Sequence, residues 1–222
     1  MTKPLRAALD VIIRSLETPK TVLEIGSRQA INQEELANFR SLFPSSKYLG
    51  IDAQEGPGVD QVVNAQILPF KANSFDMVLC FETLEHVDKP WIVCSEIERV
   101  LKPSGVAIVS GQQNFPIHMH PSDYYRFTPY GMKSLFPFLI SKIVVAISPP
   151  FDDEVKLNPQ HEILIGSKLN INKQLGKIKK ALRRNIDTIS VHKPYVHRLD
   201  EIGRLIRRAI SEIRFRQEIE FF

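Results

Sequence analysis

Residues 68–111 constrain the fold more than any other part of the 222-residue chain. Phe75–Phe81 is a short and almost wholly apolar run, which is typical of a parallel strand covered on both faces. A helical pattern of apolar residues follows, with Asp88 as its predicted N-cap and Pro90 in its first turn. Pro103-Ser104-Gly105 is predicted to end the helix, and Val106–Val109 to form the next buried strand. We therefore expect a β-α-β unit with parallel strands and a right-handed crossover.

The other predicted elements lie on both sides of this unit. One face of an N-terminal helix carries Leu5, Leu9, Ile12 and Leu16. Further strands are expected at residues 21–25, 48–52, 62–65, 141–148 and 161–167, and further helices at residues 32–42 and 128–136. The polar and aromatic stretch between Gln112 and Tyr130 is predicted to be a long loop of the kind that often forms functional lids.

Three predicted strands end in residues that suit a bound ligand. Gly26 ends the first strand, and its lack of a Cβ allows a ligand to approach the backbone. Asp52 ends the second strand, where a carboxylate can accept hydrogen bonds from both hydroxyls of a ribose. Asn64 ends the third, with an oxygen for an exocyclic amine, and the Ala65 amide can donate to a purine ring. Ligands of open parallel sheets bind at the carboxyl ends of the strands, so these residues predict one shared site.

The strings SFDMVLCFETLEHV and EIERVLKPSG resemble the class I S-adenosylmethionine-dependent methyltransferases, in particular the type 11 group, over roughly residues 21–111. The resemblance implies a Rossmann-like, doubly wound α/β sheet of seven strands, mostly parallel with an antiparallel last strand. It also implies that the cofactor is S-adenosylmethionine. By the same resemblance, Glu24 and Gly26 match the first motif, Asp52 the ribose acid and Asn64-Ala65 the adenine contact. Phe81 and Glu82 stand where the family holds the methionine end of the cofactor.

The first motif departs from the family pattern, because Gly26 is the one glycine of three that is present. Arg28 brings a Cβ and a charge to a tight turn beside a cationic sulfonium. This side chain either points away, meets the carboxylate of the ligand or weakens binding. A degenerate fold that acts as a partner-binding module is therefore an alternative. The incomplete glycine pattern also argues against a nicotinamide or flavin enzyme, which needs close backbone approach to a pyrophosphate.

Two places offer a catalytic base for methyl transfer, although positioning alone can supply much of the catalysis. His86 follows the fourth strand, where a structural histidine is the simpler interpretation. The second place is the loop of residues 118–127, in which His120 and Asp123 are candidate bases. A metal site formed by His118, His120 and Asp123 is a minor alternative, and a packed lid without catalytic role is another.

The same loop resembles an H-P-x-D-Y-x-R-F-T-P string of a methyltransferase subgroup often associated with bacterial surface-polysaccharide gene sets. The resemblance implies a small-molecule or glycan-type acceptor and a place in polysaccharide biosynthesis. Tyr124 and Tyr125 offer aromatic rings that can stack on a sugar, Arg126 can bind an anion, and His118 completes the predicted acceptor-binding residues.

The chain is predicted to divide into a methyltransferase domain at residues 1–168 and a basic extension of two helices at residues 169–222. Residues 1–166 carry 15 Lys and Arg against 19 Asp and Glu, whereas residues 167–222 carry 14 against 6. The net charges are therefore −4 and +8. The regular apolar faces of the extension fit packing on the body, a homodimer contact or peripheral binding to an acidic membrane. Nucleic acid is not expected as a partner, because aromatic residues are sparse in the extension and the body is acidic.

The composition is that of a soluble globular protein, with 43% hydrophobic and 24% charged residues. No signal peptide is visible, and the most apolar run, Phe136–Ile147, is too short to span a bilayer and is interrupted by Ser141 and Lys142. Cys80 and Cys94 are expected to be buried free thiols of a reducing compartment. We therefore expect a cytoplasmic protein, with peripheral membrane contact as an alternative.

Overall fold

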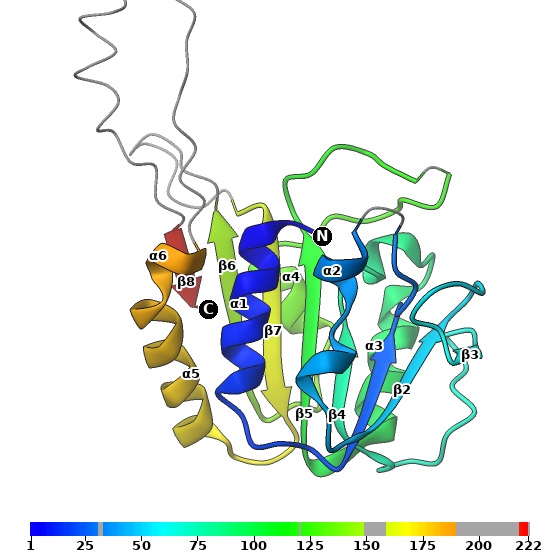
Figure 1. Ribbon diagram of the computed structural model, residues 1–222, viewed down its shortest axis with the longest axis horizontal. Coiled ribbons are helices and arrows are strands. Elements are labelled where there is room, and N and C mark those ends of the chain that lie inside the picture. Colours follow the sequence, from blue (N-terminus) through cyan, green and yellow to red (C-terminus); the bar gives the residue numbers. More distant parts are fainter. Residues whose placement is uncertain (31–32, 120, 149–158, 190–217, 222) are drawn as a thin grey trace, which may run out of the picture.

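The computed structural model describes residues 1–30, 33–119, 121–148, 159–189 and 218–221. Its centre is one sheet of eight strands in the order β3-β2-β1-β4-β5-β7-β6-β8 (Figure 1). The strands are β1 (Thr21–Ile25), β2 (Lys47–Asp52), β3 (Gln61–Val62), β4 (Phe75–Cys80), β5 (Leu101–Gln112), β6 (Ser141–Ser148), β7 (His161–Ser167) and β8 (Glu218–Phe221).

The sheet is mixed, and its parallel part contains β1 to β5. β7 lies between β5 and β6 and is antiparallel to both. These seven strands confirm the predicted Rossmann-like sheet with its antiparallel last strand. The prediction of seven strands was incomplete, because β8 pairs antiparallel with β6 as an eighth strand. The sequence patterns indicated no strand at this position.

Helices cover both faces of the sheet, as the uninterrupted apolar runs of its strands require. Two clusters of buried residues follow from this, and β7 shows the division: Ile163 and Ile165 belong to one cluster and Leu164 to the other. One face carries α1 (Lys3–Arg14), α2 (Glu34–Ala37), η1 (Arg40–Leu42), α5 (Asn172–Arg184) and α6 (Ile186–Ile189). The other carries α3 (Pro90–Val100) and α4 (Pro129–Ser134), and η2 (Leu84–His86) follows β4.

The organising β-α-β unit is confirmed, but both ends of its helix were predicted wrongly. Asp88 does not cap α3: the helix begins after Lys89 without a side-chain cap, and Asp88 accepts a hydrogen bond from Gln66 instead. The helix ends at Val100, because Leu101 already pairs with Phe75 in the sheet. The predicted stop residues therefore belong to β5.

The predicted helix at residues 32–42 is also interrupted in the part that the structure describes. It is replaced by α2 and η1, and between them Phe39 turns into the core. The ring of Phe39 lies 4.6 Å from that of Phe81, so a long-range aromatic contact takes precedence over a continuous helix. The third strand is shorter than predicted, since β3 contains Gln61 and Val62 only.

The first helical pattern of the extension forms α5, and its apolar face is covered. Leu175, Ile178 and Leu182 are buried in the same cluster as the core residues of α1, and Figure 1 shows α5 beside α1. The second pattern, Leu199–Ile213, lies outside the described residues.

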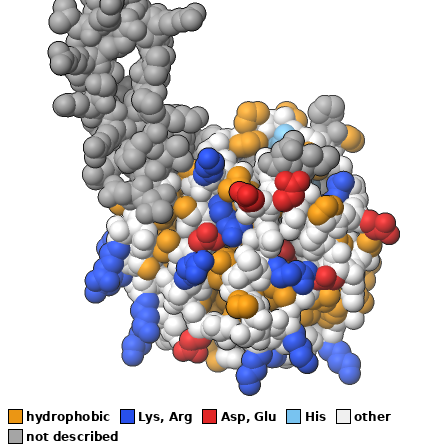
Figure 2. Space-filling model, in the orientation of Figure 1, with side chains coloured by type: hydrophobic (Ala, Val, Ile, Leu, Met, Phe, Trp, Pro, Cys, Tyr) orange, Lys and Arg blue, Asp and Glu red, His pale blue; other side chains and the backbone are white. Residues whose placement is uncertain are grey.

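Figure 2 shows the face of the molecule that is seen in Figure 1. Lys and Arg side chains are dispersed over this face, many of them near its lower edge. No helix within the described residues is long and apolar enough to cross a membrane.

Candidate active site

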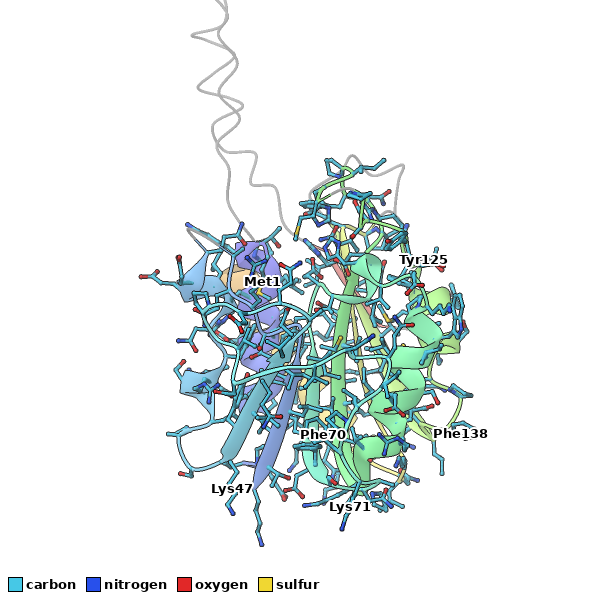
Figure 3. All side chains as sticks on the ribbon, turned by 90° about the vertical axis from the view of Figure 1, so that its right-hand side faces the viewer. Met1, Lys47, Phe70, Lys71, Tyr125 and Phe138 are labelled. Atoms are coloured by element: carbon cyan, nitrogen blue, oxygen red, sulfur yellow. The ribbon has the colours of Figure 1, made fainter. Side chains whose placement is uncertain are left out.

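A cleft of about 1200 Å³ opens at the carboxyl ends of the parallel strands. Figure 1 shows the loop after β5 arching over this edge of the sheet. In Figure 3, Tyr125 of that loop lies near the same edge, whereas Lys47 and Lys71 mark the opposite one. The residues predicted for the cofactor all line the cleft: Glu24, Gly26, Asp52, Asn64, Ala65, Phe81 and Glu82.

Gly26 forms the turn that follows β1, and its backbone requires glycine. Its φ angle is +76°, and a Cβ at this position would lie 1.9 Å from Oγ1 of Thr83. The amides of Gly26 and Ser27 both donate to the carbonyl of Ile51, at 2.9 and 3.0 Å. The first turn is therefore fixed against β2 and against the segment that follows β4.

Arg28 is directed towards the loop that follows β2. Its Nη1 donates to Oε1 of Gln54 at 2.8 Å, and its aliphatic part lies against Gly56, where a Cβ would approach it to 3.0 Å. The side chain is exposed at this end of the cleft. It points away from the tight turn, which was one of the predicted possibilities. This position gives no support to the alternative of a spoiled cofactor site.

Backbone groups hold the side chains of Asp52, the last residue of β2, and Asn64, which lies just after β3. The two oxygens of Asp52 accept from the amides of Gln54 at 3.0 Å and Arg28 at 3.3 Å. The oxygen of Asn64 accepts from the amide of Gln66 at 2.9 Å. These contacts fix the orientation of both side chains and leave further lone pairs for a ligand.

Glu24 lies in β1, just before the turn at Gly26, and its side chain is buried. Burial raises the pKa of Glu24 to about 7, although the hydroxyl of Tyr48 donates to its Oε2 at 2.6 Å and partly offsets this effect. Glu24 therefore changes charge close to neutral pH.

Glu82 presents a second carboxylate to the cleft. Its backbone has a φ angle of +48°, and its carboxylate accepts from Ser110 Oγ and Gln112 Nε2, both at 2.9 Å. Nδ1 of His161 lies 3.0 Å from Oε2. Burial alone would raise the pKa of Glu82, but His161 and the two hydrogen-bond donors hold the pKa below its usual value. Glu82 is therefore a fixed negative charge.

Gln112 and His161 were not identified from the sequence. Gln112 ends β5, and β7 runs antiparallel, so its first residue, His161, is paired with Gln112 at the same edge. The signal for Gln112 was its position at a strand end. His161 could have been identified only from the pairing of β7 with β5 and from its antiparallel direction, which together place the first residue of β7 at the cleft.

Glu85, His86 and His118 lie close together beside the cleft. One potential ligand atom from each lies within 4.8 Å of the others, and the two imidazole rings are edge to face. Glu85 is fully buried, and neither of its oxygens has a hydrogen-bond partner. Burial, and then the charge of Glu82, raise the pKa of Glu85 well above its usual value. His86 and His118 both line the cleft.

Asp123 and Arg126 form an ion pair inside the loop. Arg126 Nη1 donates to Oδ1 of Asp123 at 2.6 Å and Nη2 to Oδ2 at 2.8 Å. Arg126 also donates to the carbonyls of Phe115, Pro116 and Tyr125. The guanidinium of Arg126 holds the pKa of Asp123 far below its usual value. These contacts indicate that the pair fixes the loop, rather than binding an anion or acting as a base.

The remaining predicted residues are divided between the cleft and the loop packing. Tyr124 is exposed and lines the cleft, whereas Tyr125 donates to the carbonyl of Asp88 at 3.0 Å and stacks on Phe127. The structure thus brings His86, His118 and Tyr124 together at one wall. His120 lies outside the described residues.

Comparison with known families and curated proteins gives a consistent result. Residues 23–109 match the type 11 family model, which is described as a methyltransferase domain. An uncharacterized methyltransferase of Mycobacterium marinum is 38% identical over 55 residues, which cover 25% of this chain and 22% of that protein. A Mycobacterium tuberculosis relative described in the same words is 37% identical over 54 residues. The chain thus matches about a fifth of the length of these curated relatives.

Solved structures share the fold at low sequence identity. A SAM-dependent methyltransferase from Archaeoglobus fulgidus has a TM-score of 0.59 at 13% identity, covering 73% of this chain and 92% of its own. The Burkholderia thailandensis 1,6-didemethyltoxoflavin-N1-methyltransferase, solved with 1,6-didemethyltoxoflavin and S-adenosylhomocysteine, has a TM-score of 0.55 at 16% identity. The coverage is 75% of this chain and 79% of that one. Residues 23–109 are therefore similar to the type 11 family of methyltransferase domains, and the chain has the fold of solved class I methyltransferases.

Proposed function

We propose that this protein transfers a methyl group from S-adenosylmethionine to a small-molecule or glycan-type acceptor. The observation that carries the proposal is the convergence of three strand ends, marked by Gly26, Asp52 and Asn64, on one cleft that also contains His86 and His118. We therefore assign two binding functions to this one cleft. The strand ends suit an adenosyl ligand, and the loop and its histidines suit an acceptor.

The residues of the cleft fit the cofactor chemically. S-adenosylmethionine supplies a methyl group activated by a positively charged sulfur. Asp52 is proposed to bind the ribose hydroxyls, and Asn64 with the Ala65 amide the adenine ring. Glu82 carries a negative charge fixed by Ser110, Gln112 and His161, which favours a cationic ligand at the far end of the same cleft. Phe81 gives this end an apolar wall.

The acceptor is proposed to bind under the loop of residues 113–126. His118, Met119, Ser122 and Tyr124 of this loop line the cleft, and Tyr124 and Met119 are 51% and 67% exposed. A mixture of an aromatic ring, a thioether and imidazoles suits a ring compound with hydroxyl groups. Arg126 and Asp123 act indirectly, because their ion pair holds the loop in place.

His86 and His118 are the groups proposed to handle the proton of the acceptor. Nδ1 of His86 lies 2.6 Å from the carbonyl oxygen of Ser122, which can only accept, so Nδ1 carries the hydrogen. Nε2 of the neutral ring then has a free lone pair, which can accept the proton of the acceptor. His118 is oriented in the same way by the carbonyl of Pro116, 3.2 Å from its Nδ1. Positioning and proton removal together are the catalysis that we propose.

Binding of the cofactor is tested by thermal unfolding with and without S-adenosylmethionine and S-adenosylhomocysteine. A ligand at about 100 times its dissociation constant should stabilise the protein by roughly 2.7 kcal/mol. Asp52→Ala should remove this stabilisation while the protein without ligand keeps its unfolding temperature. Glu55→Ala, at an exposed position that does not line the cleft, is the matched control. Absence of stabilisation by both ligands in the wild-type protein would refute the proposal.

Methyl transfer is tested with S-adenosylmethionine labelled in its methyl group and a set of acceptors. The set should contain free sugars, sugar nucleotides and small phenols, together with a protein and an RNA as the acceptor classes that we do not expect. Label in a sugar or phenol fraction, lost in the Asp52→Ala variant, is the expected result. Label in the protein or RNA alone would contradict the proposed acceptor class.

A further inference from the structure

We propose that Glu85, His86 and His118 bind a divalent transition-metal cation, of the Zn²⁺ type, beside the proposed cofactor site. One potential ligand atom of each residue lies within 4.8 Å of the others. Tetrahedral ligands at about 2.0–2.3 Å from a metal lie about 3.3–3.8 Å from one another, so the ligand atoms must approach by about 1 Å when the metal binds. Two imidazoles and one carboxylate are a ligand set of Zn²⁺, Fe²⁺, Mn²⁺ and Co²⁺ rather than of Mg²⁺ or Ca²⁺.

The first observation is that the carboxyl group of Glu85 is buried and lacks a partner. Glu85 exposes none of its surface, and both side-chain oxygens lack a hydrogen bond. Buried polar groups are normally paired with protein groups, ordered water or an ion, because burying them without a partner is costly. The two nearby imidazole nitrogens show which of these partners the site is built to hold.

The second observation is the orientation of both histidines. Nδ1 of His86 is fixed by the Ser122 carbonyl at 2.6 Å, and Nδ1 of His118 lies 3.2 Å from the Pro116 carbonyl and 3.3 Å from Oδ2 of Asp123. All three partners are acceptors, so both Nδ1 atoms carry hydrogen and both Nε2 atoms are free. Metal-binding histidines are held in this way, with one nitrogen on the metal and the other donating to a carbonyl or carboxylate.

The neighbouring ion pair explains why Asp123 is not one of the ligands. Both oxygens of Asp123 accept from Arg126, and Oδ2 also accepts from the amide of His118 at 2.8 Å. Asp123 therefore supports His118 rather than binding a cation. The ligand set differs from the minor alternative considered from the sequence, which combined His118, His120 and Asp123.

The position of the cation suggests its use, and this part rests on the proposed function. Three protein ligands leave coordination positions open, and His86 and His118 line the cleft. A hydroxyl oxygen of the acceptor can occupy such a position, and the cation would lower its pKa. The cation, rather than a free imidazole, would then activate the hydroxyl group of the acceptor. Methyl transfer should therefore be inhibited by chelators.

Metal binding is tested directly on the full-length protein without an affinity tag and after treatment with a chelator. Calorimetric titration with Zn²⁺, and the visible absorption of added Co²⁺, should show one bound ion per chain. Glu85→Gln, His86→Gln and His118→Gln should each weaken binding by about tenfold or more. The control Glu55→Gln should bind as the wild type does. His118 is partly exposed, so its variant should fold even if the Glu85 variant does not.

Two results would overturn the inference. One is a wild-type protein that binds neither ion, and the other is undiminished binding in the His86 and His118 variants, which would locate the ion elsewhere. Stabilisation by S-adenosylhomocysteine is measured in the same samples. If that stabilisation is found without metal binding, this inference fails and the proposed function stands. If metal binds and no adenosyl ligand does, the proposed function fails and the cation site stands.

Discussion

Gly26 and Thr83 are packed so closely that a Cβ on Gly26 would lie 1.9 Å from Thr83 Oγ1 and 2.9 Å from Thr83 Cβ. This contact joins the turn after β1 to the segment after β4, and both line the cleft. The sequence explained Gly26 by the approach of a ligand. The structure adds a second reason, which is the approach of another part of the same chain.

The first prediction is that Gly26→Ala destabilises the protein by about 2 kcal/mol or more, since it adds left-handed strain to steric overlap. It should also weaken binding of S-adenosylhomocysteine. Adding Thr83→Ala should recover part of the stability, because the hydroxyl and methyl groups of Thr83 are removed. Gly176→Ala is the control: Gly176 lies in α5 with nothing within 4 Å of a Cβ, so alanine should stabilise by roughly 0.5–1 kcal/mol. Urea unfolding measures all three, and an unchanged Gly26→Ala protein would contradict the prediction.

A second prediction concerns Glu162, which is fully buried in β7 without a partner for either oxygen. Burial raises the pKa of Glu162 to about 9, whereas 4.5 is the ordinary value. The folded state therefore holds a proton that the unfolded state releases, and the stability should fall as the pH rises from about 4.5 to about 9. The fall is at most about 1.4 kcal/mol for each pKa unit.

Glu162→Gln cannot ionise and should lack this part of the pH dependence. Its stability relative to the wild type should therefore increase by about 3 kcal/mol or more between pH 5 and pH 9. Urea unfolding at several pH values measures the difference. The exposed variant Glu55→Gln serves as the control. Parallel pH profiles for Glu162→Gln and the wild type would show that the argument is wrong.

A third prediction follows from the hydrogen bond between Tyr48 and Glu24. Binding of the positively charged S-adenosylmethionine should strengthen about three- to tenfold between pH 5.5 and pH 7.5, as Glu24 loses its proton with a pKa of about 7. Glu24→Gln should remove this dependence. Tyr48→Phe removes a hydrogen bond that lowers the pKa of Glu24, so the transition should move to higher pH. Calorimetric titration across this pH range is the measurement, and a transition at the same pH in Tyr48→Phe would be the contrary result.

A fourth prediction concerns the ion pair of Asp123 and Arg126. Arg126→Ala removes the guanidinium partner of a carboxylate with no exposed side-chain surface and leaves it with His118, and we expect a loss of about 2 kcal/mol or more in the local stability of the loop. Hydrogen exchange should become faster at residues 113–119 and 121–126, and KM for the acceptor should rise. Lys102→Ala, which removes a more exposed ion pair with Asp76, should change neither. Unchanged exchange in the loop of Arg126→Ala would exclude a role in holding it.

The parts of the site that the sequence predicted are those set by local structure. Gly26, Asp52 and Asn64 lie at or just after the ends of three parallel strands, so their meeting at one edge follows from the topology. The meeting of Glu85 with His118 does not, because it depends on how a long loop folds back onto η2. Arg126 illustrates the same limit: its charge suggested an anion, but its partner is Asp123, three residues away.

The place of β7 between β5 and β6 has a consequence for how the chain folds during synthesis. β5 is complete about 50 residues before its neighbour His161–Ser167 leaves the ribosome, so its edge stays unpaired for that time. His161 is then the last of the groups around Glu82 to arrive. The negatively charged end of the cleft is therefore finished only when the antiparallel strand inserts, and a nascent chain that stops before residue 161 leaves the edge of β5 open to aggregation.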